Sequence, residues 1–215
     1  MQTFNKENKP FNVLVCVPSL GQINSSLVGQ LIGWAQKGAA IGFITGVYPV
    51  DRARNEMVKM LEGMPEHITH MLMVDADTIP PADALEKLLA LHADIATGLT
   101  HIFHDSDKNN ITIGTNAFSR MYFNEEKGKE EQATIAQDTG IQKFIRCGAS
   151  CMLVKRSVFQ EMIKDGLCFR FELDLMDNGR YKGEDYYFCD RAREAGYRML
   201  CDTSVLCEHS KTIKI

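Results

Sequence analysis

The run His70–Pro81, HMLMVDADTIPP, carries a short apolar segment directly into two aspartates that are separated by one residue. Residues 71–74 are all apolar, which is typical of a strand buried on both faces of a sheet. Asp75 and Asp77 follow where this strand ends. On an extended segment the Cα atoms of the two aspartates lie about 6–7 Å apart, and their carboxylates repel each other in a cleft of low dielectric constant. A buried strand that ends in this way requires something that offsets the two charges.

The residues on both sides of this strand alternate between strand and helix patterns. The predicted strands are 12–17, 40–45, 69–75 and 94–100. The predicted helices between them begin after an N-cap at Asn24 or Ser25, at Arg52, and at Pro80–Pro81. This alternation predicts an α/β fold in which a mainly parallel central sheet is flanked by helices. In such sheets ligands bind at the carboxyl ends of strands, which is where the two aspartates lie.

The second half of the chain is less regular. Residues 101–143 are polar and interrupted, and we expect loops there with room for one hairpin. The later predicted elements are a strand, bend and strand over 144–155, helices over 157–166 and 184–196, and final short strands over 197–202 and 204–209. The sequence contains no repeat and no clear linker, so we expect a single domain over residues 1–215.

Composition narrows the class of protein. The chain has 215 residues, of which 45% are hydrophobic and 24% charged, and a formal net charge of −4. These values are typical of a soluble globular protein and give no general attraction to nucleic acid or to an anionic membrane. The seven cysteines form no Cys-x-x-Cys pair, which favours reduced, buried thiols. Residues 1–10 are polar, and no apolar stretch approaches the roughly 20 residues of a membrane helix, so we expect a cytoplasmic protein.

Two explanations of the Asp-x-Asp pair remain open from the tripeptide alone. Aspartates cap helices, and Asp77 precedes a predicted helix. A divalent cation would also offset the two charges, because hard oxygen ligands suit Mg²⁺ or Mn²⁺. A metal ion held by one or two carboxylates keeps coordination positions open for phosphate oxygens. The pair is therefore also consistent with a site for a metal ion and a diphosphate.

The segment 70–89 resembles the Asp-x-Asp segment of the GT-A fold glycosyltransferases, which use nucleotide-sugars. Four other segments resemble parts of that family in the expected order: 15–34, the first strand and nucleotide-side loop; 50–62, the helix start that borders the nucleotide-sugar; 147–162, the segment before the last helix; and 181–209, the Glu-Asp helix followed by a terminal histidine. The resemblance implies a single Rossmann-like GT-A domain. About residues 1–100 would bind the nucleotide-sugar, and about 101–215 would form the acceptor side.

The same resemblance, carried over position by position, implies roles for individual residues. Asp77 and His209 would bind Mn²⁺ or Mg²⁺, and Asp75 would contact the ribose, or the metal through water. Asp185 would be the general base if the enzyme inverts, with Glu184 beside it. The further implied contacts are to the nucleotide-sugar by Arg54 and Asn55, and to the nucleoside by Pro18, Ser19 and Asp51. Structural roles remain open for three of these residues: Asp185 as a charge at a helix start, Arg54 in a surface ion pair, and His209 as an ordinary surface histidine.

The resemblance thus implies a metal-dependent glycosyltransferase that moves a sugar from a nucleoside-diphosphate sugar to an unknown hydroxyl acceptor. That acceptor could be a glycan, a lipid-linked sugar, a protein or a nucleic-acid base. One alternative is a sugar-phosphate nucleotidyltransferase, which needs a basic, glycine-rich loop for a triphosphate; residues 18–26 contain one glycine and no lysine or arginine. The other is a non-catalytic nucleotide-binding or glycan-binding module on the same scaffold.

Overall fold

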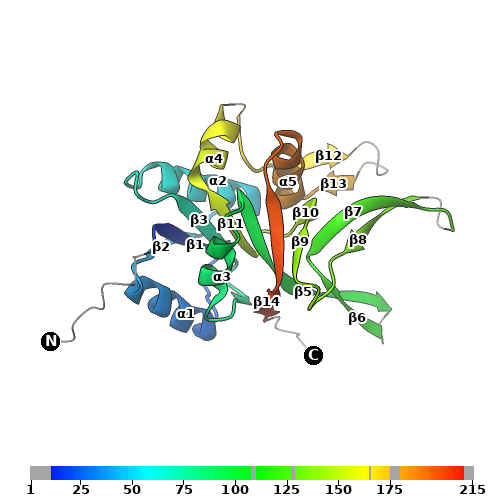
Figure 1. Cartoon of the computed structure of the whole chain (residues 1–215), viewed down its shortest axis with the longest axis horizontal. Coiled ribbons are helices and arrows are strands. Elements are labelled where there is room, and N and C mark those ends of the chain that lie inside the picture. Colours follow the sequence, from blue (N-terminus) through cyan, green and yellow to red (C-terminus); the bar gives the residue numbers. More distant parts are fainter. Residues whose placement is uncertain (1–10, 108–109, 127–128, 165, 175–179, 211–215) are drawn as a thin grey trace.

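The computed structural model describes residues 11–107, 110–126, 129–164, 166–174 and 180–210. The strands of its central sheet follow the order β2-β1-β3-β11-β5-β14-β4 (Figure 1). These strands are β1 (Val13–Ser19), β2 (Ala40–Thr45), β3 (His70–Val74), β4 (Thr78–Ile79), β5 (Ile95–Asp107), β11 (Cys151–Lys155) and β14 (Met199–His209). β1, β2, β3, β5 and β14 share one direction, whereas β11 and β4 run against it. The predicted mainly parallel sheet is confirmed, with one reversed strand in its middle.

Helices cover both faces of this sheet (Figure 1). α1 (Ser25–Gln36) and α3 (Ala84–Ala90) lie on one face, and α2 (Val50–Glu62), α4 (Arg156–Ile163) and α5 (Glu184–Glu194) lie on the other. Alternate residues of β1 enter the two cores: Val15 packs with the α1 side, whereas Leu14 and Cys16 pack with the α2 side. Burial on both faces explains why β1 is apolar throughout. None of the helices in the described residues is long and apolar enough to cross a membrane.

The start of α3 differs from the prediction. We expected this helix to begin at Pro80–Pro81, but it begins at Ala84. Thr78 and Ile79 instead form β4, which pairs with the end of β14. A residue that precedes proline disfavours helical backbone angles, and this pairing keeps Thr78 and Ile79 extended. The segment after Asp77 is therefore a short strand, and Asp77 does not cap a helix.

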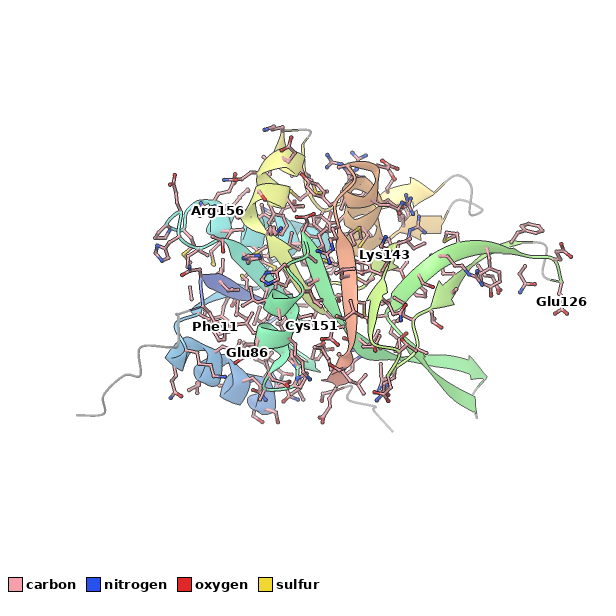
Figure 2. The ribbon with its side chains drawn as sticks, in the orientation of Figure 1. Phe11, Glu86, Glu126, Lys143, Cys151 and Arg156 are labelled. Carbon is pink, nitrogen blue, oxygen red and sulfur yellow. The ribbon has the colours of Figure 1, made fainter. Side chains whose placement is uncertain are left out.

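Residues 101–143 form more strand than predicted. β5 extends to Asp107 and pairs with β6 (Asn110–Thr115), and β7 (Ala117–Asn124) pairs with β8 (Lys129–Thr134). The other short strands of this half are β9 (Ile141–Lys143), β10 (Arg146–Cys147), β12 (Glu172–Asp174) and β13 (Arg180–Lys182). The β7–β8 hairpin projects from the body, with Glu126 at its far end, whereas Cys151 lies inside the body (Figure 2). β6 and β8 each pair with a strand that neighbours them along the chain, and such local pairing does not require the apolar pattern that marks a core strand.

β14 is one long strand rather than the two short strands predicted. Its register on β5 shifts between Cys201 and Leu206, which is a β-bulge. Gly98 of β5 makes this possible, because a Cβ atom there would lie 2.5 Å from the Val205 carbonyl oxygen. The continuous strand carries His209 to the edge of the sheet at which β3 ends. All seven cysteines of the chain are buried and free.

Candidate active site

Asp75 and Asp77 lie at the carboxyl end of β3. The Asp75 amide donates to the Ser150 carbonyl at 3.1 Å, which continues the pairing with the reversed strand β11 by one residue. The Thr78 amide then donates to the Asp75 carbonyl at 3.0 Å, so the chain turns immediately after the strand. This turn separates the two side chains: the Asp75 side chain is 33% exposed and the Asp77 side chain 53% exposed.

The Asp77 side chain meets His209, which is 132 residues away in the sequence. β4 pairs with the end of β14, so His209 lies opposite Thr78, and the two side-chain atoms His209 Nε2 and Asp77 Oδ2 are 3.1 Å apart. His209 Nδ1 lies 3.1 Å from the His101 carbonyl oxygen, which can only accept a hydrogen bond. Nδ1 therefore carries the proton, and in a neutral imidazole Nε2 presents a lone pair to a carboxylate. Such a pair requires a proton or a cation between the two atoms.

These two side chains fit a hard divalent cation. Adjacent ligands of an octahedral ion bound at about 2.1 Å lie about 3 Å apart, which matches the 3.1 Å between the Asp77 and His209 atoms. The contact of Nδ1 with a carbonyl is the usual support of a metal-binding histidine. Within the described residues, no group of three or more His, Cys, Asp or Glu side chains is arranged to hold a metal ion. The remaining coordination positions would thus be open to other oxygens.

Asp75 has a different partner. Its Oδ1 atom accepts a 2.6 Å hydrogen bond from Nη2 of Arg54, an α2 residue that is 2% exposed. Arg54 Nε also lies 3.9 Å from Oε1 of Glu184. Burial lowers the pKa of Arg54, but the negative charges of Asp75 and Glu184 outweigh burial and raise it above the ordinary value. Arg54 is therefore a fixed buried cation beneath this group of carboxylates.

Glu184 and Asp185 occupy the first turn of α5. Burial, together with the charge of Asp185, raises the pKa of Glu184 to about 7, although the charge of Arg54 opposes the shift. Burial also raises the pKa of Asp185, against the hydrogen bond that its Oδ1 atom accepts from the Tyr186 amide at 2.8 Å. The preceding residue is Gly183, where a Cβ atom would lie 2.7 Å from that same oxygen. Glycine thus leaves the space that the Asp185 carboxylate occupies.

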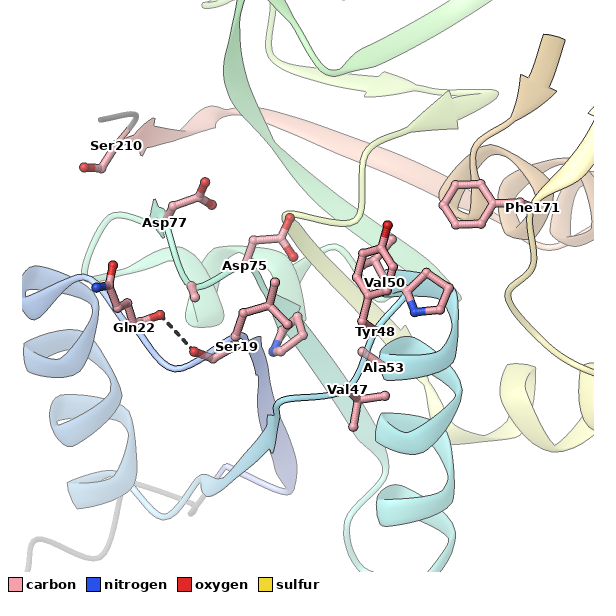
Figure 3. Close-up of a pocket in the computed structure, with 14 residues that line it drawn as sticks. Ser19, Gln22, Val47, Tyr48, Val50, Ala53, Asp75, Asp77, Phe171 and Ser210 are labelled. Atoms are coloured by element: carbon pink, nitrogen blue, oxygen red, sulfur yellow. Dashed lines mark hydrogen bonds between the residues drawn. The ribbon is translucent and has the colours of Figure 1, made fainter. Parts of the chain in front are cut away.

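A cavity of about 800 Å³ opens beside Asp75 and Asp77 (Figure 3). Its lining residues are Pro18, Ser19, Leu20, Gln22, Val47, Tyr48, Pro49, Val50, Ala53, Asp75, Ala76, Asp77, Phe171 and Ser210. Two exposed aromatic side chains belong to it: Tyr48 is 76% exposed and Phe171 41% exposed. The cavity therefore combines aromatic surface with the two carboxylates that follow β3.

The structure brings together only part of the predicted site. Pro18, Ser19, Asp75 and Asp77 line the cavity. The predicted residues that do not line it are Asp51, Arg54, Asn55, Glu184, Asp185 and His209. His209 joins the site through Asp77, and Glu184 joins it through Arg54. The roles assigned to all of these residues stay predictions.

Asn55 and Asp51 face the protein interior rather than the cavity. Asn55 Nδ2 donates to the carbonyl oxygens of Asp51 and Phe169, both at 2.7 Å, and Oδ1 accepts from the Phe169 amide at 3.2 Å. Asn55 thus fixes the segment that leads to Phe171. The Asp51 Oδ1 atom is buried and has no hydrogen-bond partner among the described residues.

Sequence reasoning missed several lining residues. Tyr48 and Phe171 are recognisable in the structure, because large aromatic side chains left exposed often mark binding surfaces. The sequence alone does not show that they are exposed. Gln22 and Ser210 carry no signal at all. They reach the cavity because the loop after β1 and the end of β14 both border Asp77.

The chain matches known proteins in two comparisons. Residues 44–214 match the model of a family described as Glycosyltransferase like family 2. The crystal structure of A197 from STIV superposes with a TM-score of 0.60 and 15% identity, over 93% of this chain and 86% of that one. The crystal structure of GalNAc-T7 with UDP, GalNAc and Mn²⁺ superposes with a TM-score of 0.55 and 10% identity, over 94% of this chain and 44% of that one. No curated protein matches.

Proposed function

Because this chain belongs to the glycosyltransferase-like family 2, and is a glycosyltransferase, we propose that it transfers a sugar from a nucleoside-diphosphate sugar to a hydroxyl acceptor with the help of Mn²⁺ or Mg²⁺. One observation carries the proposal: His209 Nε2 lies 3.1 Å from Oδ2 of Asp77, a residue that lines the cavity. The solved structure of GalNAc-T7, which has the same fold, contains UDP, GalNAc and Mn²⁺, and this supports the choice of donor and metal ion.

Asp77 and His209 would hold the metal ion through one carboxylate oxygen and one imidazole nitrogen. When bound there, a divalent cation supplies positive charge that stabilises the departing diphosphate, which can be worth several kcal/mol. The His101 carbonyl keeps the proton on His209 Nδ1, so that Nε2 stays available as a ligand. Asp75 is held by Arg54 and lines the cavity, where it can accept a hydrogen bond from a ribose hydroxyl.

The cavity itself would hold the nucleoside. Tyr48 and Phe171 offer exposed aromatic faces, and stacking of a base on an aromatic side chain is worth about 1–3 kcal/mol. Pro18 and Ser19 lie beside Asp75 along the same lining. The hydrogen bond from Asn55 to the Phe169 carbonyl and the one from Arg54 to Asp75 would keep this lining in place.

Asp185 would remove the proton from the acceptor hydroxyl. Burial raises the pKa of this carboxyl, which makes its ionised form a stronger base, and general-base catalysis typically contributes about 10²–10⁴-fold. Glu184 shares the buried Arg54 with Asp75, and the positive charge of Arg54 opposes the effect of burial on the pKa of Asp185. The chain would act as one domain, with the donor bound mainly by residues 1–100 and the acceptor mainly by residues 101–215.

A thermal-shift screen tests this proposal. UDP, GDP, CDP, ADP and dTDP are each added with and without MnCl₂, and one of them should raise the melting temperature in a metal-dependent way. Asp77→Asn should abolish this rise. Asp83→Asn, which changes another exposed aspartate, should retain it.

The corresponding nucleotide-sugar should then be hydrolysed slowly in the absence of an acceptor. If instead the protein requires a nucleoside triphosphate and releases pyrophosphate, it is a nucleotidyltransferase. If a nucleotide binds but no sugar is ever released, the chain is a binding module. Either outcome would overturn the proposed reaction.

A further inference from the structure

Asn116 is a buried polar residue between β6 and β7 that none of the roles above uses. It is 3% exposed. Its Oδ1 atom accepts a hydrogen bond from the Thr100 amide at 2.8 Å, and Nδ2 donates to Ser150 Oγ at 3.1 Å and to the Gly148 carbonyl at 3.4 Å. Its backbone adds two more bonds, to the Thr100 carbonyl and from the Gly148 amide. One side chain thus joins β5 to the bend at residues 148–150.

That bend lies between the two groups of carboxylates. On one side, the Ser150 carbonyl accepts the hydrogen bond of the Asp75 amide at 3.1 Å. On the other, a Cβ atom at Gly148 would lie 3.6 Å from Asp185 Oδ2 and 3.3 Å from Asn116 Nδ2. Position 148 thus faces the Asp185 carboxylate, and a side chain there would touch it. A shift of the bend would therefore move Asp75 relative to Asp185.

We infer that Asn116 is a positioning residue for glycosyl transfer: by holding the 148–150 bend it fixes the separation between Asp75 on the donor side and Asp185 on the acceptor side. This inference rests on the proposed function, since it assigns those two sides. Asn116 itself touches neither carboxylate through a hydrogen bond among the described contacts, so it acts through Gly148 and Ser150.

The chemistry of the amide explains why asparagine suits this position. The Thr100 N–H needs an acceptor, while Gly148 and Ser150 offer oxygens that need a donor, and an amide supplies both within one short side chain. Alanine would leave the buried Thr100 N–H unpaired. Ser150 Oγ would still have Thr100 Oγ1 at 2.8 Å, and the Gly148 amide would still donate to the carbonyl of residue 116, so the bend would lose only its side-chain links to this position.

The metal-binding pair does not depend on this link. Asp77 and His209 are held by the pairing of β4 with β14 and by the His101 carbonyl. Loosening the bend should therefore leave binding of the metal ion and diphosphate largely intact while it changes the separation between Asp75 and the proposed base Asp185. A misplacement of about 1 Å can reduce a catalytic rate about 10²-fold.

The test compares wild type with Asn116→Ala and Ser150→Ala, and uses Thr203→Val as a control. Thr203 is buried and donates to the Gly140 carbonyl, but it contacts neither the bend nor the carboxylates. The first readout is kcat and KM for hydrolysis of UDP-glucose, UDP-N-acetylglucosamine and GDP-mannose. The second is the shift in melting temperature with MnCl₂ and the matching diphosphate. The third is the exchange rate of the Asp75 amide hydrogen, measured by nuclear magnetic resonance.

We expect Asn116→Ala to reduce kcat about 10–100-fold and to speed exchange of the Asp75 amide at least tenfold. KM and the metal-dependent shift in melting temperature should change less than twofold. Ser150→Ala, which removes a smaller group and should fold readily, is expected to reduce kcat about threefold to tenfold. Thr203→Val should leave kcat, KM and Asp75 exchange within twofold of wild type.

Three outcomes would overturn the inference. If the Asp75 amide exchanges faster but kcat stays within twofold, the bend has become more mobile and the reaction rate does not depend on its position. If KM and the metal-dependent shift collapse together with kcat, Asn116 merely supports the fold. If wild type itself hydrolyses none of the three nucleotide-sugars and binds no diphosphate, the proposed function has failed and the inference falls with it.

Discussion

The candidate site contains two sets of acidic side chains that differ in what balances their charge. The Asp77 side chain is 53% exposed and its Oδ2 atom lies 3.1 Å from His209 Nε2, whereas the Glu184 side chain is 10% exposed and its Oε1 atom lies 3.9 Å from Arg54 Nε. An exposed carboxylate can receive a cation from solution. A buried one must be paired with a charge of the protein itself or become protonated.

Two aspartates of one Asp-x-Asp motif belong to different sets. Asp75 and Asp77 are two residues apart, yet Asp75 turns to the buried Arg54 and Asp77 turns to His209. Asp75 therefore links the two sets, since it lines the cavity and shares Arg54 with Glu184. Four predictions would break or sharpen this contrast between an open set and a closed set.

The largest effect is expected at the open set. Asp77→Ala should reduce the rate of nucleotide-sugar hydrolysis about 10³–10⁴-fold, because the departing diphosphate would lose its metal ion. His209→Ala should reduce it to a comparable extent, and the double variant should be little worse than either single one, since both residues serve one ion. Steady-state kinetics with MnCl₂ measure this. Additive losses would show that the two residues act independently.

At the closed set, Asp185→Asn should reduce the transfer rate about 10²–10³-fold while the metal-dependent binding of diphosphate persists. The amide keeps the shape of the side chain but cannot accept a proton. Calorimetric titration with the matching diphosphate and MnCl₂ checks the binding, and Asp202→Asn on β14 serves as a control that should retain full activity. Loss of diphosphate binding in Asp185→Asn would place this residue in the donor site instead.

Arg54→Met tests whether the closed set depends on its internal cation. Removal of one partner from a buried ion pair typically destabilises a protein by about 3–5 kcal/mol, so the midpoint of urea unfolding should fall markedly. Lys59→Met on the same helix removes an exposed ion pair with Glu56 and should change the free energy of unfolding by less than about 1 kcal/mol. Equal effects of the two substitutions would contradict a buried, charge-balancing Arg54.

Glu184→Gln should produce the smallest effect, and one that depends on pH. Burial raises the pKa of Glu184 from an ordinary value of 4.5 to about 7. A carboxyl with a raised pKa stabilises the fold below its unfolded pKa, and this contribution is lost as the pH rises through the folded pKa. Between pH 4.5 and 7 the wild type should thus lose up to about 3 kcal/mol that the glutamine variant does not lose.

Urea unfolding of wild type and Glu184→Gln at pH 5 and pH 8, without metal ion, measures this difference. The variant should gain stability relative to wild type on going to pH 8. A difference between the two proteins that stays constant with pH would mean that Glu184 is ionised at both values.

Much of the scaffold was predictable because local patterns determine it. β1 is apolar on both faces since both faces are covered, and its sequence shows this directly. The placement of Asp75 and Asp77 at a strand end followed from the same reasoning. The reversed direction of β11 was not predictable, because an apolar run such as CMLVK fits any interior position of the sheet in either direction.

The detailed geometry of the site depends on contacts that are distant in sequence. The pairing of β4 with β14 brings Asp77 to His209, and only the family resemblance suggested that these two residues meet. The hydrogen bond from Arg54 to Asp75 likewise joins two residues that are distant in sequence, and the predicted contact of Arg54 with the nucleotide-sugar stays a prediction. The Asn116 network joins β5, β7 and the 148–150 bend, and no local pattern indicates such a junction.

The most direct test is a crystal of the protein grown with MnCl₂ and the diphosphate selected by the thermal-shift screen. Anomalous scattering should place one Mn²⁺ at about 2.1–2.3 Å from both Asp77 Oδ2 and His209 Nε2, with diphosphate oxygens completing its coordination. A diphosphate bound in the cavity without Mn²⁺ at these two atoms would contradict the proposed metal-assisted departure of the nucleoside diphosphate.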